Sequence, residues 1–107
     1  MAVRHSVRIA RPIVRRYVRV LEKNRIRPRS GYLFGSYVSG TPTPDSDIDV
    51  AVVSDDLSGD RIEDAVLLMR HRWSVDLRIE PHPFRPEDFT PDNIWVAEIL
   101  RTGVKIV

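Results

Sequence analysis

The sequence predicts a small α/β domain, of the α+β kind, in which helices pack against a sheet of three or four strands. Near the N-terminus, apolar residues recur at the i, i+3, i+4, i+7 spacing of a helix: Val14, Tyr17, Val18 and Leu21. Residues 48–53 and 75–80 place apolar side chains at every second position, which is typical of strands with one buried face. A helical segment separates these two strands, so helices and strands alternate along the chain.

The N-terminal region is predicted to contain one helix, over residues 12–25. Pro12 suits a first helical turn, and the chain then enters a loop with proline and glycine at 27–31. Residues 1–9 are predicted to form a flexible tail.

Residues 31–80 are predicted to form the catalytic core of the domain. A short apolar strand ends at Gly35, one helical turn follows, and two prolines within residues 41–45 make the next connection rigid. The strand at 48–53 buries three aliphatic residues: Ile48, Val50 and Val52. A helix from residue 60 to about 72 leads to the third strand and has four residues on its inner face: Ile62, Ala65, Val66 and Met69.

The C-terminal part, residues 91–107, is predicted to form a helix and a short strand. Three prolines within residues 81–86 predict an extended loop before it. The helix covers about 91–101 and ends before Gly103, a typical C-cap, and residues 104–107 can add a last strand.

Length and composition indicate a single domain over residues 1–107, since a chain of this size supports one core and leaves no room for a second lobe. The absence of cysteine excludes disulfides and thiolate metal sites. No apolar run approaches the ~20 residues that cross a bilayer, so no membrane contact is expected. The N-terminus lacks the apolar segment of a signal peptide, and a cytoplasmic location is therefore expected.

Charge is unevenly distributed along the chain. Residues 1–30 hold ten Lys or Arg and one acidic residue, which gives a net charge of +9. Residues 31–107 hold seven Lys or Arg and fourteen acidic residues, which gives a net charge of −7. The basic region can meet an acidic or phosphate-rich partner, or its arginines can simply line the solvated face of the first helix. Binding to nucleic acid would weaken steeply with salt. Because the single aromatic residue among these arginines, Tyr17, belongs to the apolar stripe of the helix, nucleic acid is not the expected partner.

The most specific pattern joins Gly35 and Ser36 to a pair of aspartates, Asp47 and Asp49. Alternate residues of a strand project from one face, so both carboxylates point the same way, roughly 7 Å apart. Mg²⁺ is usually held by one or two carboxylates together with the phosphates of a substrate. Glycine lets the backbone approach a phosphate, and Ser36 offers a hydroxyl and an amide at the start of a helix. The pattern therefore indicates a nucleotide site that uses a metal.

Residues 35–50, with the Gly-Ser pair before a short helix and Asp-Ile-Asp opening a strand, resemble the signature of the DNA polymerase beta-like nucleotidyltransferase superfamily. At 107 residues the chain is most similar to the minimal nucleotidyltransferases, and the resemblance extends over about residues 31–107. It implies a mixed sheet with helices packed on one face and the metal site on the other. It also implies two Mg²⁺ ions, or Mn²⁺ in their place, bound by Asp47 and Asp49, and ATP as the leading nucleotide.

Asp76 is predicted to supply a third carboxylate. Val75 and Leu77 on either side of it face inward, which leaves Asp76 on the face of the two aspartates. The resemblance points to the same position and implies that Asp76 binds the catalytic metal and helps to deprotonate the acceptor hydroxyl. Arg78 and Glu80 share the predicted face, so Arg78 either contacts phosphate or offsets the charge of the carboxylates.

Spacing excludes a calcium loop of the EF-hand type. Counting from Asp45, position six should be glycine and is Val50, and position twelve should be glutamate and is Asp56. Ser46 is expected to brace the start of the strand rather than to contact substrate. Among the histidines, only His82 is a candidate for the site, because its loop follows the third strand.

The resemblance implies that the chain transfers AMP from ATP to a hydroxyl of a partner protein, as the antitoxin of a pair whose toxin has a HEPN domain. The alternative is a non-catalytic antitoxin or interaction module with a vestigial metal site. Resistance enzymes that modify aminoglycosides share the motif but complete the drug site with a further domain. This chain could form a homodimer, which could build such a pocket, or a hetero-oligomer.

Overall fold

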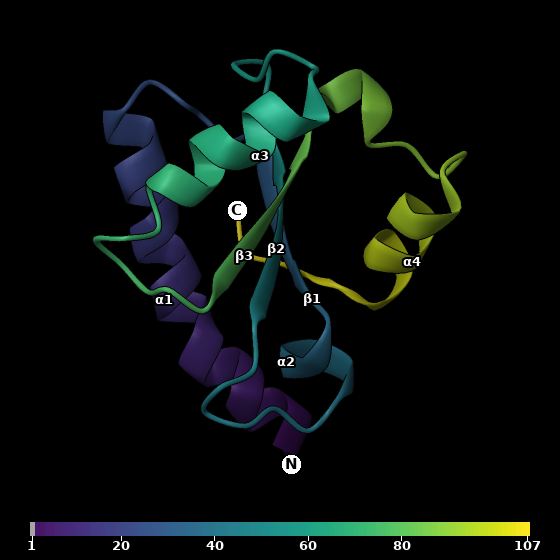
Figure 1. Cartoon of the computed structure of the whole chain (residues 1–107). Helices are drawn as coiled ribbons and strands as arrows, with labels where there is room; N and C mark the ends of the chain where they lie inside the picture. The colour runs from purple at the N-terminus through teal and green to yellow at the C-terminus, as the bar shows by residue number, and fades with distance from the viewer. Residues whose placement is uncertain (1) are drawn as a thin grey trace.

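The computed structural model describes residues 2–107 and shows a four-stranded mixed sheet in the order β3-β2-β1-β4, with helices packed against it (Figure 1). Strand β1 (Ser30–Phe34) pairs antiparallel with β2 (Ile48–Val53) and with β4 (Val104–Lys105). Strand β3 (Ile79–Phe84) pairs parallel with β2. The predicted fold class and the number of strands are therefore confirmed.

Helix α1 (Ala2–Lys23) begins earlier than predicted. Residues 2–9, expected to be a flexible tail, are helical, and the first residue lies outside the described part of the chain. Val7 and Ala10 are buried and continue the apolar stripe of the helix, which explains why the helix extends through Pro12 although proline removes one helical hydrogen bond. None of the helices within residues 2–107 combines the length and the apolar character needed to cross a membrane.

Helix α3 (Arg61–Arg70) lies beside α1, and both contribute to the larger core on one face of the sheet (Figure 1). The phenol of Tyr17 on α1 donates a hydrogen bond of 2.6 Å to the carbonyl of Leu68 on α3. The side chain of Asp60 caps α3 by accepting hydrogen bonds from the amides of Ile62 and Glu63. The start of this helix is therefore close to the predicted position.

The predicted inner face of α3 is wrong for two of its four residues, while the other two are half-buried. Ile62 and Val66 are exposed, whereas Asp64 and Leu68 are buried. The Asp64 carboxylate accepts hydrogen bonds of 2.9 Å from the amides of Ser58 and Gly59. Because amides of the loop before the helix provide hydrogen bonds to the buried Asp64 carboxylate, the side of α3 that carries Asp64 can turn inward.

Helix α4 (Ile94–Thr102) packs on the opposite face of the sheet. A second, smaller core lies there, formed by Ala51, Val53, Phe84, Val96 and Ile99. The helix begins at Asn93, whose side chain accepts hydrogen bonds from two backbone amides, and it ends at the predicted Gly103. The face of the sheet that carries Asp49 is thus partly covered by a helix, so the expected arrangement, with the helices on one face and the metal site on the other, is wrong for α4.

Strand β3 lies four residues later than predicted, and the predicted loop over residues 81–86 is wrong. Two prolines, Pro81 and Pro83, are part of the strand. β3 is at the edge of the sheet, and only every second residue on its side makes backbone hydrogen bonds to β2; the prolines lie at the positions between them. The first of these bonds runs from the Ile48 amide to the Arg78 carbonyl at 2.7 Å. The positions without an N–H group therefore face the open edge, where proline is tolerated.

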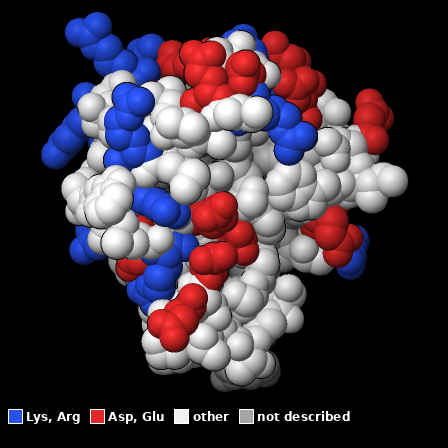
Figure 2. Space-filling model, viewed as in Figure 1, with Lys and Arg blue, Asp and Glu red and all other residues white. Residues whose placement is uncertain are grey.

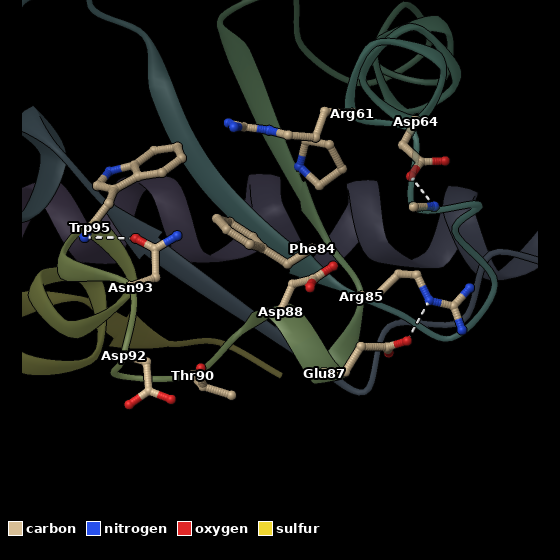
Figure 3. Close-up of a pocket in the computed structure, with 12 residues that line it drawn as sticks. Arg61, Asp64, Phe84, Arg85, Glu87, Asp88, Thr90, Asp92, Asn93 and Trp95 are labelled. Carbon is tan, nitrogen blue, oxygen red and sulfur yellow. Dashed lines mark hydrogen bonds and ion pairs between the residues drawn. The ribbon is translucent and has the colours of Figure 1, made fainter.

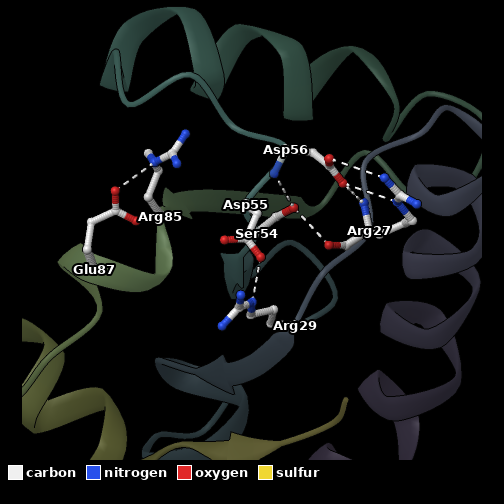
Figure 4. A network of polar contacts seen from close by, with 7 residues as sticks. All are labelled: Arg27, Arg29, Ser54, Asp55, Asp56, Arg85 and Glu87. Atoms are coloured by element: carbon white, nitrogen blue, oxygen red, sulfur yellow. Dashed lines mark hydrogen bonds and ion pairs between the residues drawn. The ribbon is translucent and has the colours of Figure 1, made fainter.

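A network of polar contacts joins the start of β1 to the end of β2 (Figure 4). The backbone amide of Arg27 donates to Asp56 at 2.9 Å, and the hydroxyl of Ser54 donates to the carbonyl of Arg27 at 2.8 Å. Arg29 pairs with Asp55 in the same region. The hydrogen bonds from the Arg27 amide and side chain hold the pKa of Asp56 below its ordinary value. These contacts fix the end of the β1–β2 pair that lies away from Asp49.

Candidate active site

The turn after β1 brings Gly35 directly against Asp49. Gly35 has φ of +79°, a backbone conformation that residues other than glycine rarely adopt. A Cβ atom at this position would lie only 2.4 Å from Oδ2 of Asp49. The register of β1 and β2 places Phe34 opposite Asp49, which puts the turn beside the carboxylate. The two halves of the sequence motif therefore meet in the fold.

Helix α2 (Ser36–Ser39) is a single turn that follows Gly35. The amides of Val38 and Ser39 both donate to the carbonyl of Gly35 at 3.0 Å. Tyr37 and Val38 are buried and anchor the turn, whereas Ser36 is half-buried at its start. The first amides of a helical turn have no partner within it, so this segment can offer N–H groups and a hydroxyl to an anion.

Asp49 is the second residue of β2, and Asp47 lies immediately before the strand. The loop before them is braced as predicted, because the amide of Thr43 donates to Oγ of Ser46 at 2.8 Å and the amide of Ser46 donates back to the carbonyl of Thr43 at 3.0 Å. Asp47 is exposed and Asp49 is half-buried, while Ile48 between them is fully buried on the other face. Figure 2 shows a group of acidic side chains over this part of the sheet.

Asp76 lies in the turn before β3 and not on a strand, so its predicted place on the third strand is wrong. Its two oxygens accept hydrogen bonds from the Arg78 guanidinium, at 3.0 Å from Nε and 2.8 Å from Nη2. This pairing lowers the pKa of Asp76 and raises the pKa of Arg78. Arg78 also donates to the phenol oxygen of Tyr37 at 3.1 Å. The sequence left two roles open for Arg78, contact with phosphate or charge compensation of a carboxylate, and in the structure Arg78 pairs with the Asp76 carboxylate.

Strand β3 brings two other side chains to the face of Asp49. Its parallel register places Glu80 opposite Asp49 and His82 opposite Ala51. Nε2 of His82 lies 3.1 Å from Oδ1 of Asp49, and Oε2 of Glu80 lies 3.7 Å from Nη1 of Arg72. Glu80 was predicted to share the face of Asp76 and the two aspartates, and the register places it on the face of Asp49. Its place directly opposite Asp49 was not predicted, because the strand was expected over residues 75–80 and the prolines concealed the strand at 79–84.

The carboxylates at the start of β2 fit a hard cation that is shared with a phosphate substrate. Within residues 2–107, no three histidine, aspartate or glutamate side chains are close enough to form a complete metal site. Asp47 and Asp49 supply two carboxylates, which suffice for a Mg²⁺ ion that also takes water and substrate phosphates as ligands. The hydrogen bond from His82 to Asp49 is of the kind that orients carboxylate ligands.

A cleft of about 520 Å³ opens between the start of α4 and the end of β3 (Figure 3). Phe84 and Trp95 supply its aromatic lining, and Arg61 and Asp88 are among its charged residues. The ring of Trp95 also packs against His82, with ring centroids 5.2 Å apart. One wall of the cleft is therefore in contact with the histidine that binds Asp49.

Residues 13–98 match the model of the nucleotidyltransferase domain family. This match covers most of the chain, and the protein belongs to that family. The region includes the Gly-Ser turn, both aspartates and β3, so the family model spans the whole corner described above.

The fold is also similar to those of two solved toxin–antitoxin structures. A chain of a toxin–antitoxin crystal structure with AMP-PNP has 23% sequence identity and a TM-score of 0.60, over 84% of this chain and 68% of that chain. A chain of the toxin–antitoxin MntA-HpeT, in a mutant with two aspartates changed to glutamate, has 22% identity and a TM-score of 0.55, over 87% of this chain and 71% of that chain. No curated protein matches the sequence.

Proposed function

We propose that this protein is a metal-dependent nucleotidyltransferase that transfers AMP from ATP to a hydroxyl group of a partner protein. The observation that carries the proposal is the contact between the Gly35 turn and the carboxylate of Asp49, with Asp47 two residues earlier. In this reaction the acceptor hydroxyl attacks the α-phosphate of ATP and pyrophosphate leaves. The reaction needs a phosphate-binding turn beside carboxylates, and this corner of the fold combines the two.

Each residue of the corner has a distinct role in this proposal. The backbone at Gly35 and the hydroxyl of Ser36 bind the phosphates of the nucleotide. Asp47 and Asp49 hold Mg²⁺, with two ions proposed and Mn²⁺ as a substitute. When bound, the metal neutralises charge on the phosphates and lowers the pKa of the acceptor hydroxyl.

A third carboxylate is proposed to complete the set, and there are two candidates. Asp76 was predicted from the sequence, but the guanidinium of Arg78 binds both of its oxygens. Glu80 lies opposite Asp49 in the parallel register, and side chains at paired positions of neighbouring strands project from the same face. The register favours Glu80, and Asp76 is the alternative.

We propose that the acceptor is the toxin of a toxin–antitoxin pair, a HEPN-domain protein that is silenced by the transfer. Two observations support this context. One of the structural neighbours is a toxin–antitoxin structure with AMP-PNP, an analogue of ATP. The other carries glutamate at two aspartates that are two positions apart, the same spacing as Asp47 and Asp49.

The second candidate function is a non-catalytic antitoxin that neutralises its partner by binding alone. It is favoured by one observation, namely that residues 2–107 contain no preassembled group of three metal-ligating side chains. In that case the aspartates would be dispensable for neutralisation.

Transfer of label from ATP distinguishes the two functions. The protein is incubated with Mg²⁺, the product of a neighbouring gene, and ATP labelled at either the α- or the γ-phosphate. We expect the α-label alone to become attached to the partner, and we expect Asp47→Asn and Asp49→Asn to abolish the transfer. Asp45→Asn is the matched control, because this exposed aspartate lies just before the pair. Neutralisation without any transferred label, unaffected by either substitution, would establish the binding function instead.

A further inference from the structure

His82 makes a contact with Asp49 that joins two neighbouring strands. Nε2 of His82 lies 3.1 Å from Oδ1 of Asp49, and both side chains are 24% exposed. An ionised carboxylate can only accept hydrogen bonds, so the contact requires a proton on Nε2. The donor therefore comes from β3 and the acceptor from β2.

Aromatic rings hold the imidazole of His82 in place on two sides. The ring of Phe34, from β1, has its centroid 5.0 Å from that of His82. The ring of Trp95, from the first turn of α4, packs edge-on at 5.2 Å, and Phe34 and Trp95 are themselves 6.0 Å apart. Because the three rings belong to three elements of the fold, rotation of the imidazole away from Asp49 would disturb packing between all of them.

The two carboxylate oxygens of Asp49 thus have neighbouring residues on different sides. Oδ1 is bound by His82, and Oδ2 lies beside Gly35, where a Cβ atom would be 2.4 Å away. Asp47, in contrast, is exposed. The orientation of the Asp49 carboxylate is therefore set by the histidine on one side and by the glycine turn on the other.

We infer that His82 is a positioning residue, which holds the Asp49 carboxylate in the orientation needed to bind a divalent cation. The inference deepens the proposed function and rests on it for the identity of the ligand. Hydrogen-bond partners of metal-binding side chains typically contribute about 10- to 100-fold to metal affinity. His82 acts through Asp49 and does not itself contact the nucleotide.

Binding of Mn²⁺ to the purified protein, followed by electron paramagnetic resonance, tests this role. We expect His82→Leu, which keeps the bulk but removes the donor, to weaken Mn²⁺ binding about 10-fold or more, and His82→Gln, which keeps an N–H donor, to stay within about threefold of wild type. The control is His71→Leu, at the C-terminus of α3. Circular dichroism establishes that each variant is folded. A His82→Leu protein that binds Mn²⁺ as wild type does would overturn the inference, and so would equal losses in the Leu and Gln variants.

The metal measurement separates this inference from the proposed function. A wild-type protein that transfers no AMP contradicts the proposed function, whereas the effect of His82→Leu on Mn²⁺ binding is measured without any transfer. The Asp49→Asn variant gives the level of Mn²⁺ binding expected when the metal site is lost. If wild type binds Mn²⁺ no better than Asp49→Asn does, both the metal site and the role of His82 are contradicted.

Discussion

Gly35 and Asp49 approach each other so closely that a methyl group on Gly35 would lie 2.4 Å from Oδ2 of Asp49. Real Cβ atoms do not come so near to a neighbouring oxygen. The approach is possible because Gly35 lacks a side chain and has φ of +79°. A turn that can cradle phosphate and a carboxylate that can bind a cation are thereby placed side by side.

Substitution Gly35→Ala is expected to displace Asp49 and to abolish most nucleotide transfer. It should also lower the free energy of unfolding by about 1–3 kcal/mol, because alanine is strained at positive φ. Gly31→Ala is the matched control, since its Cβ would have no neighbour nearer than 3.8 Å. Transfer rates and urea unfolding measure both effects. Full activity in Gly35→Ala would show that the close approach is unnecessary.

Glu80→Gln is expected to lower the transfer rate by about 100-fold or more, as loss of a catalytic carboxylate commonly does. Asp76→Asn should affect the rate much less, because Arg78 already occupies the Asp76 carboxylate. Steady-state rates of both variants, at saturating ATP and Mg²⁺, provide the comparison. The opposite ranking would identify Asp76 as the third carboxylate.

The ion pair of Asp76 and Arg78 should make stability depend on pH. The side-chain hydrogen bonds from Arg78 lower the pKa of Asp76 below the unfolded value of about 3.9. The stabilisation is therefore present above about pH 4 and is lost as the pH falls through the folded pKa. We expect Asp76→Asn to cost about 1 kcal/mol at neutral pH and clearly less in acid, as measured by urea unfolding. A cost that does not change with pH would contradict this assignment, and Asp45→Asn is the control.

Tyr17→Phe tests the link between α1 and α3. The phenol of Tyr17 is buried and donates to the Leu68 carbonyl at 2.6 Å, and that carbonyl also accepts from the His71 amide at 3.2 Å. Since the carbonyl keeps one partner, we expect a loss of about 1 kcal/mol in the free energy of unfolding at neutral pH.

Tyr17→Phe should also change how stability depends on alkaline pH. Burial raises the pKa of Tyr17 above the unfolded value of about 10. Wild type should therefore lose stability more steeply than the variant as the pH rises above about 10. Unfolding curves that differ equally at every pH would exclude a buried, neutral phenol.

The motif at residues 35–50 was predictable because it is local in sequence. The turn at Gly35, the brace at Ser46 and the buried Ile48 between the two aspartates all follow from residue types at short spacings. The end of α4 at Gly103 was predictable for the same reason. Local sequence patterns are therefore sufficient to single out the two aspartates as candidate site residues, but they do not reveal which residues surround them.

The position of β3 could not be predicted from local preference. Proline argues against a strand interior, and only the place of β3 at the sheet edge makes Pro81 and Pro83 acceptable. That place depends on pairing with β2, so the local pattern did not reveal that Glu80 lies opposite Asp49 and His82 opposite Ala51. The inner face of α3 depends on Asp64, whose burial requires loop amides that the helical pattern does not reveal.

We propose that the corner formed by Gly35 and Asp49 transfers AMP to a protein. The most direct measurement is the intact mass of the partner protein after incubation with ATP and Mg²⁺. We expect wild type to add the mass of one or more AMP groups to the partner and Asp49→Asn to add none. An unchanged mass with wild type, or the same gain in mass with Asp49→Asn, would contradict this proposal.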